Sequence, residues 1–396
     1  MANPKPCEHC GGDPVRHDVE YMSHSLDLLL QPVMAAWMRA VESMMRLVPT
    51  GQGGWSVGVY EWLVRRGWGQ LLDEPDDKTQ LLHQMLWQEA NTRGIRMREF
   101  RPFGMSKGSF VAVLPDGRVL DFEGLPLPDN SRTVWWIDTK STLRKKLAKM
   151  GVPVAMGGAA LTKAGAHKIF NRIPHPVITK PVIGSASRHT TMHITNVQEL
   201  DRAFDIARQL APMVIIEQEL SGAVYRPTLV DGKLIATLRR DQPHVVGDGI
   251  HTVEQLVAKA NTHPARQGPY FHHLQLDADA RQELAYQSLT PQSIPEKNRR
   301  VTLQQKITWG HGGTTTDVTD NVHPDNVALF EKVAKLLRAP VVGIDFIIDD
   351  ISRSWQEQKN CGIIECNSMP FFDNHHLPFE GTPRNVAKHI WDLVDR

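Results

Sequence analysis

Cysteine, net charge and long apolar runs are all scarce in this chain of 396 residues. Four cysteines in a chain of this size do not suggest a disulfide scaffold. A net charge of +1, with lysine and arginine spread along the chain, creates no overall field that favours nucleic acid or a membrane surface. No apolar run approaches the roughly 18 residues of a membrane-spanning helix, and the N-terminus lacks a secretory apolar region. We therefore expect a soluble, cytoplasmic protein that binds neither nucleic acid nor membrane.

The length suits two or three subdomains and a large core. Residues 1–137 combine helical patterns with the strand-like segments MREFRPF, SFVAVL and RVLDFEGL. The last two are joined by Pro115-Asp116-Gly117, a strong hairpin turn. These patterns predict a small α/β domain over 1–137 within a chain of the α+β class.

A CxxC pair, Cys7 and Cys10, stands near the N-terminus. Tetrahedral zinc would need two further ligands, and no second CxxC follows. Neighbouring histidines are present at His9, His17 and His24, but their spacing is not typical of a zinc site. We therefore interpret the CxxC as part of a flexible or packed terminus and do not favour zinc there.

The most informative stretch is 341–367, which reads VVGIDFIIDD, a polar loop, then CGIIECN. Two apolar runs around a charged turn predict an antiparallel hairpin. Side chains alternate along a strand, so Glu365 and Asn367 point to one side, and Asp345 on the partner strand can face the same way. Two carboxylates and an amide oxygen suit Mg²⁺. The alternative is an acidic strand end that faces solvent.

A second candidate site lies in the middle of the chain. A helix is predicted over 138–150, and the strand PVITKP places Lys180 beside the Gly/Ser-rich loop 184–191. Such a loop can close backbone N–H groups over phosphates while a lysine neutralises them. A plain hairpin explains the same residues equally well.

Three further elements are predicted towards the C-terminus. A hairpin turns at Asp231-Gly232. The segment 309–320 is rich in glycine and threonine and is predicted to be a loop. Thr382-Pro383 has the pattern of an N-cap and first helical residue, so a final helix is expected to begin there.

Together these pieces resemble the ATP-grasp superfamily of carboxylate–amine ligases, with particular likeness to the ATP-grasp module of cyanophycin synthetase and to the glutathione-synthetase half of bifunctional glutathione synthetases. Seven segments match in the family's order: IDTKSTLRKKLAKMGVPV, HPVITKP, VIIEQELSG–YR, HVVGDGIHT, GGTTTDVTDNVHPDN, GIDFIIDDIS and IIECNSMP–HLPFEGTPRNVA. The resemblance implies an ATP-grasp fold of two α/β lobes clasping ATP, with a nucleotide lobe at about 138–220 and a catalytic lobe at about 221–396. We expect a stand-alone ligase with its own N-terminal domain.

The resemblance also implies roles for particular residues. Lys140 and Lys180 match the lysines that hold the α- and β-phosphates. The other nucleotide-binding positions that it implies are Gly184, Ser185 and Ser187 in the loop, Glu217 beside adenine, and the backbone of Gln218 and Leu220. Asp345, Glu365 and Asn367 match the magnesium ligands, in agreement with the hairpin pattern. Arg226 and Arg240 match arginines near the phosphates and the acyl substrate, and with Lys180 they are the catalytic candidates.

The sequence departs from the family at several positions. Val224 stands where an acidic residue usually accepts hydrogen bonds from the ribose, and the loop GSASRHTT has one glycine where relatives have several. Phe371-Phe372-Asp373 replaces a Gly-Phe-Arg of cyanophycin synthetases. Asp373 would repel a substrate carboxylate and attract an amine or guanidinium. We expect Asp373, His375 and Arg240 to face the substrate.

The implied activity is ATP-dependent formation of an amide bond between a carboxylate and an amine through an acyl phosphate. ATP and Mg²⁺ are the implied cofactors, with one or two ions and with Mn²⁺ as a substitute. The implied partners are amino-acid or peptide substrates and further copies of the chain, in a homodimer or homotetramer. No general base stands out, and the candidates are His311, His375 and His376. Two alternatives remain: a degenerate ATP-grasp protein that only binds nucleotide, and a small-molecule kinase.

Overall fold

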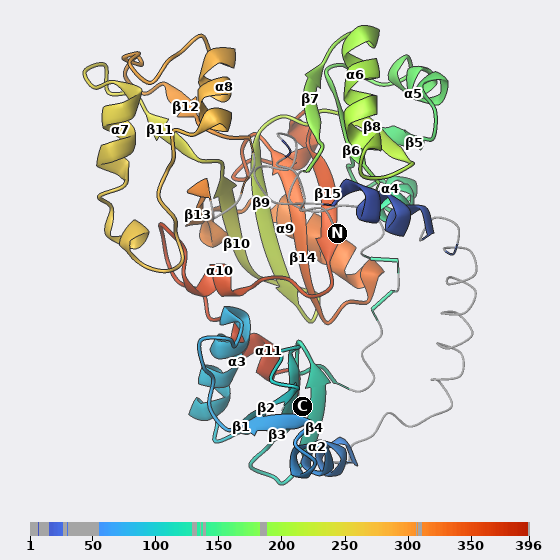
Figure 1. Ribbon diagram of the computed structural model, residues 1–396, viewed down its shortest axis with the longest axis vertical. Coiled ribbons are helices and arrows are strands. Elements are labelled where there is room, and N and C mark those ends of the chain that lie inside the picture. The colour runs from blue at the N-terminus through green and yellow to red at the C-terminus, as the bar shows by residue number, and fades with distance from the viewer. Residues whose placement is uncertain are drawn as a thin grey trace.

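The computed structural model describes residues 7, 16–26, 30, 55–128, 133–134, 136–137, 140–182, 188–305, 307 and 311–394. Its strands form one five-stranded sheet, two four-stranded sheets and one two-stranded sheet. Figure 1 shows the five-stranded sheet at the centre, with the other units arranged around it. Among the described residues, no helix has both the length and the apolar character needed to cross a bilayer.

The first unit is an antiparallel sheet in sequence order with two helices beside it. Its strands are β1 (Gly69–Leu72), β2 (Arg96–Pro102), β3 (Ser109–Val113) and β4 (Val119–Glu123), and its helices are α2 (Trp55–Arg65) and α3 (Leu81–Thr92). The predicted turn at 115–117 is confirmed, with Gly117 at φ +87°, a conformation that favours glycine. The small α/β unit expected here is therefore present in the described residues.

The C-terminal helix α11 (Val386–Trp391) returns to this first unit and packs against α3 (Figure 1). Trp391 is fully buried in the same apolar core as the sheet, and its Nε1 donates to the Leu86 carbonyl oxygen at 3.0 Å. The expected start at Thr382-Pro383 is wrong: the helix begins at Val386, and the Asn385 side chain caps it by accepting from the Lys388 N–H. The core of the first unit thus includes the end of the chain, while the division at residue 137 stays a proposal.

The second unit is a four-stranded antiparallel sheet in the order β5-β8-β6-β7. Its strands are β5 (Gly157–Ala160), β6 (Val177–Pro181), β7 (Thr191–Ile194) and β8 (Val214–Gln218), and its helices are α4 (Lys140–Lys149), α5 (Lys163–Phe170) and α6 (Val197–Arg208). The predicted helix over 138–150 corresponds to α4, which ends before Gly151 at φ +69°. This unit holds Lys140, Lys180 and Glu217.

The central sheet has the order β13-β10-β9-β14-β15, with α9 (Pro324–Leu337) packed on it. Its strands are β9 (Ala223–Val230), β10 (Lys233–Asp241), β13 (Thr314–Asp317), β14 (Val341–Ile348) and β15 (Gly362–Asn367). The predicted hairpin at Asp231-Gly232 joins β9 to β10, and both turn residues have positive φ. The loop expected over 309–320 is wrong in part, because Thr314–Asp317 pairs with β10 as an edge strand.

An insertion between β10 and β13 forms a small unit with a core of its own. It contains β11 (His244–Val246), β12 (Arg300–Thr302), α7 (Val253–Ala260) and α8 (Ala278–Tyr286). In Figure 1 it lies at the upper left, on the opposite side of the central sheet from the second unit. The central sheet therefore connects all the other units, and its strands carry most of the candidate catalytic residues.

Candidate active site

The acidic residues of the predicted hairpin face each other across β14 and β15. Asp345 is the direct cross-strand partner of Glu365, and Asn367 lies opposite Gly343 one step further along the same face. Asp345 is buried, whereas Glu365 and Asn367 are half-buried. The hairpin is confirmed, and it gathers two carboxylates and one amide on one face of a rigid sheet.

Two arginines on the neighbouring strands approach Asp345. Arg226 on β9 forms a bidentate ion pair with it, from Nε to Oδ1 at 2.7 Å and from Nη2 to Oδ2 at 2.6 Å. Arg240 on β10 places Nη1 3.6 Å from Oδ2. Burial acts to raise the pKa of Asp345, but the charge and hydrogen bonds of Arg226 outweigh it and hold the pKa below its usual range. The lowered pKa favours the charged form of Asp345, which is an acceptor only.

The donor set of this face fits a hard divalent cation. Each carboxylate oxygen has two lone pairs, so the Asp345 oxygens keep acceptor capacity beyond their bonds to Arg226. The Nδ2 of Asn367 is buried and has no hydrogen-bond partner among the described residues, so this amide is not fixed in one orientation. Two carboxylates and an amide oxygen match the ligands of Mg²⁺.

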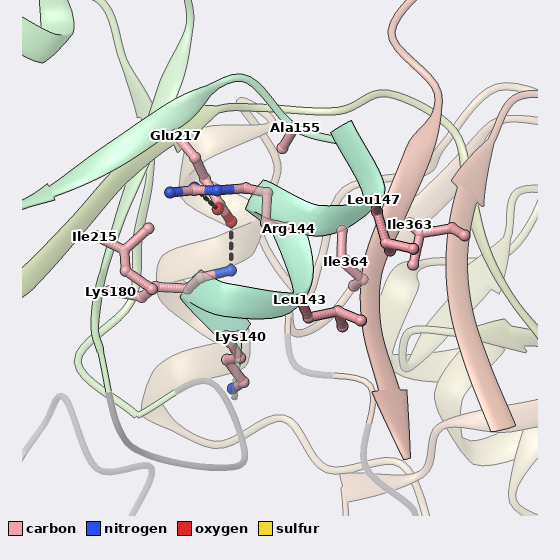
Figure 2. Close-up of a pocket in the computed structure, with 10 residues that line it drawn as sticks. All are labelled: Lys140, Leu143, Arg144, Leu147, Ala155, Lys180, Ile215, Glu217, Ile363 and Ile364. Carbon is pink, nitrogen blue, oxygen red and sulfur yellow. Dashed lines mark hydrogen bonds and ion pairs between the residues drawn. The ribbon is translucent and has the colours of Figure 1, made fainter. Parts of the chain in front are cut away.

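A second cluster lies in a small pocket, drawn in Figure 2, between α4, β6, β8 and β15. Glu217 on β8 accepts from Lys180 Nζ and, at 3.1 Å, from Arg144 Nη1. Lys140, at the start of α4, also lines this pocket. The structure thus brings together three residues implied by the resemblance, Lys140, Lys180 and Glu217.

Arg144 is a pocket residue that the sequence reasoning missed. It lies four residues after Lys140 on α4, and residues at this spacing share one face of a helix. The i, i+4 pair of basic residues was therefore a usable signal. It was not distinctive, because α4 carries four lysines besides this arginine.

The remaining pocket walls are apolar and come from two units of the fold. They consist of Leu143, Leu147, Ala155, Ile215, Ile363 and Ile364. The two units touch beside the pocket: the Ile363 N–H donates to the Pro153 carbonyl oxygen at 2.9 Å, and Gln218 Nε2 donates to Asn360 Oδ1 at 2.8 Å. The cavity is only about 20 Å³, far below the roughly 300 Å³ of the smallest typical ligand pockets. In this conformation the cavity is too small for a nucleotide base.

Asp373 and His375 lie in α10 (Asp373–His376), close to Arg226. Burial raises the pKa of Asp373 to about 6, and its Oδ1 has no hydrogen-bond partner among the described residues. His375 is fully buried, its Nε2 is 2.7 Å from the Thr228 hydroxyl, and burial lowers its pKa to about 3. In this conformation the side chain of His375 exposes no surface to a substrate. The Oδ1 of Asp373, in contrast, accepts no hydrogen bond from the described residues.

Other candidates are placed as follows. His376 accepts from the Ala387 N–H at 3.2 Å, which gives it a structural contact. Val224 lies on β9 opposite Arg240, and Leu220 is half-buried after β8. Gly184, Ser185 and Ser187 lie outside the described residues.

The sequence is similar to curated proteins of known name. It is 32% identical over 259 residues to the cyanophycin synthetase of Nostoc sp., a match that covers 64% of this chain and 29% of that protein. It is 31% identical over 200 residues to the glutathione biosynthesis bifunctional protein GshAB of Clostridium perfringens, covering 50% of this chain and 26% of that protein. The chain therefore spans less than a third of the length of these relatives. No protein-family model matches it.

A solved structure shares the fold. The bifunctional glutathione synthetase from Pasteurella multocida superposes with a TM-score of 0.54 at 24% identity, covering 73% of this chain and 41% of that one. Together with the sequence likeness, this confirms the ATP-grasp fold and the resemblance to ATP-grasp ligases.

Proposed function

We propose that this chain, with its ATP-grasp fold and its sequence likeness to ATP-grasp ligases, is an ATP-dependent carboxylate–amine ligase. The observation that carries the proposal is the cross-strand pair of Asp345 and Glu365, with Asn367 on the same face and Arg226 and Arg240 beside it. A protein that only bound nucleotide would have little need for this acidic set next to a buried and a half-buried arginine.

The proposed reaction has two steps. An oxygen of the substrate carboxylate attacks the γ-phosphorus of ATP, the bond to the β–γ bridging oxygen breaks, and ADP leaves. The amine nitrogen then attacks the acyl carbon, the bond to phosphate oxygen breaks, and the amine loses a proton. The protein contributes positioning and charge neutralisation in both steps.

Different residues of this chain provide the positioning and the charge neutralisation. Lys140 and Lys180 bind the α- and β-phosphates, and Arg240 and Arg226 neutralise charge on the transferred phosphoryl group and the acyl substrate. Mg²⁺, which Asp345, Glu365 and Asn367 are suited to hold, supplies charge neutralisation at the phosphate oxygens when bound. The loop with Gly184, Ser185 and Ser187 and the backbone of Gln218 and Leu220 complete the proposed nucleotide site.

The substrate side is proposed from Asp373. Its buried carboxylate near Arg226 favours an amine or guanidinium group over a second carboxylate. We therefore propose that the amine partner is an amino acid or peptide whose positive group lies against Asp373. Cytoplasmic location and homo-oligomeric assembly are part of the same proposal.

The test uses Lys180→Ala and Glu365→Gln with ATP, Mg²⁺ and pools of amino acids and dipeptides. Both variants should lower ADP release about 100-fold or more, because each removes a group that offsets or anchors phosphate charge. Glu357→Gln is the matched control, since Glu357 is exposed in the connection between β14 and β15. Asp345 is a poor choice, because removing one partner of a buried ion pair costs about 3–5 kcal/mol and would confuse stability with activity.

The product decides between the proposal and its alternatives. A mass equal to two substrates less one water supports the ligase. Nucleotide binding without turnover in any pool would favour the degenerate binder, and a phosphorylated product alone would favour the kinase. Near-normal activity of either Lys180→Ala or Glu365→Gln would contradict the assigned site.

A further inference from the structure

A cluster of metal-ligating side chains lies outside the proposed active site. The ligand atoms of Cys7, His17 and His189 all lie within 4.8 Å of one another. Cys7 Sγ is 3.6 Å from His189 Nε2, and the rings of His17 and His189 meet edge to face with centroids 4.8 Å apart. Cys7 and His189 are 182 positions apart in sequence, so the fold, and not local chain geometry, brings them together.

The distance between Cys7 and His189 suits a tetrahedral metal. With zinc–sulfur bonds of about 2.3 Å and zinc–nitrogen bonds of about 2.0–2.1 Å, a tetrahedral angle separates sulfur and nitrogen ligands by about 3.6 Å. Cys7 Sγ and His189 Nε2 stand at that separation. A thiol that merely hydrogen bonds to the imidazole is the competing explanation for this one contact. It does not account for His17 as a third ligand-type side chain at the same point.

The setting of His189 is typical of a metal-bound histidine. Its Nδ1 is 2.7 Å from the Ile206 carbonyl oxygen and can only donate there, which leaves Nε2 as the nitrogen with a lone pair. A backbone carbonyl on the other ring nitrogen is the usual way to orient a histidine ligand. The residue is 1% exposed and has φ +52°, in the left-handed region that histidine, like asparagine, adopts more readily than most residues. The fold thus holds the ring with Nε2 facing Cys7.

We propose that Cys7, His17 and His189 bind one zinc ion that joins the N-terminal segment to the second unit of the fold. A thiolate and two neutral imidazoles are a ligand set that favours zinc over magnesium or calcium, and the Cys7 thiol releases its proton on binding. This departs from the sequence expectation, which did not favour zinc at the CxxC.

The consequence concerns how the N-terminal helix is held. Residues 17–26 are helical, and His24 Nδ1 contacts the Leu210 carbonyl oxygen at 2.7 Å, a second link to the unit that carries His189. Figure 1 shows this dark-blue helix beside the green elements of that unit. His189 also belongs to the segment 184–191, which carries the proposed phosphate-binding loop. Zinc would therefore anchor the loop's C-terminal end, and this inference stands whether or not the chain is a ligase.

The first test measures metal in the full chain, purified with reductant and added zinc and then dialysed. We expect about one zinc per chain by elemental analysis, and a loss of most of it in Cys7→Ser and in His189→Asn. Asparagine suits position 189 because it tolerates positive φ. Cys361→Ser is the matched control, since Cys361 is also a half-buried free thiol but lies in the central hairpin. It should keep the metal.

Cobalt substitution gives a readout that needs no variant. Co²⁺ in the zinc-free chain should show the intense visible absorption of a tetrahedral thiolate site, and zinc should abolish it. Less than about one zinc in five chains, or zinc retained in both Cys7→Ser and His189→Asn, would overturn the proposal in favour of a plain hydrogen bond.

Hydrogen–deuterium exchange tests the anchoring. Removal of zinc by a chelator should speed exchange in residues 16–26 several-fold and leave the central sheet unchanged. Unchanged exchange in residues 16–26 after complete zinc removal would mean that the metal does not hold this helix, and the proposed link would be wrong.

Discussion

At the scale of single residues, Asp373 is a carboxylate buried without a full set of partners. Its pKa is raised to about 6 by burial, whereas an unfolded aspartate titrates near 4. The unfolded chain therefore loses this proton at lower pH than the folded chain, so ionisation costs stability progressively from about pH 4 to pH 6. A difference of about two pKa units corresponds to about 3 kcal/mol above pH 6.

Asp373→Asn should remove this cost. We expect the variant to be about 2 kcal/mol more stable than the parent at pH 8 and no more stable at pH 4. Urea unfolding at both pH values measures the difference. Asp349→Asn, at an exposed position just after β14, should change neither value. Equal stability of Asp373→Asn and parent at pH 8 would show that the carboxylate is better solvated or paired than the structure implies.

At the scale of elements, local chemistry predicted some features well. The turns at 115–117 and 231–232 were predicted because proline, aspartate and glycine favour the required φ angles whatever surrounds them. The strand at Thr314–Asp317 was missed because glycine and threonine alone do not distinguish an edge strand from a loop. The start of α11 was placed too early, since a Thr-Pro pattern was available but Asn385 supplies the cap.

The most consequential element is α11, whose packing on the first unit no local pattern could predict. Trp391→Ala should destabilise the protein by about 3–5 kcal/mol, because it leaves a large cavity in a fully packed core. Trp391→Phe keeps most of the apolar volume and loses the bond to the Leu86 carbonyl, so a smaller loss of about 1–2 kcal/mol is expected. Denaturant unfolding, followed by circular dichroism, measures the stability of each variant and distinguishes the two expected losses. Parent-like stability of Trp391→Ala would mean that α11 does not contribute to this core.

At the scale of the whole molecule, the sites differ in how far their residues could be predicted from the sequence. The pairing of Asp345 with Glu365 followed from strand alternation, because both residues belong to one hairpin. Lys140, Lys180 and Glu217 come from three separate elements, so only the resemblance brought them together before the fold did. The contact of Arg144 with Glu217 and the contact of Cys7 with His189 depend on packing between distant segments, which no spacing rule reports.

The pocket between the second unit and the central sheet leads to a prediction about the two units together. Because a cavity of about 20 Å³ is too small for a nucleotide base, we expect binding of the base to require an open state, and a low population of that state would reduce the apparent affinity. The ion pair between Arg144 and Glu217 is one of the contacts that keep the pocket filled. Arg144→Ala should therefore favour the open state by about 1 kcal/mol and tighten binding of a non-hydrolysable ATP analogue about fivefold.

Calorimetric titration of the analogue measures this effect, and Lys149→Ala is the matched control. Lys149→Ala removes the same charge from the same helix. Lys149, however, is exposed at the far end of α4, away from the pocket. An effect of overall charge would weaken binding in both variants alike, whereas relief of the closed state tightens it only in Arg144→Ala. Weaker binding by Arg144→Ala alone would instead make Arg144 a phosphate ligand, and opening of the pocket would then have to begin at the contact between Ile363 and Pro153.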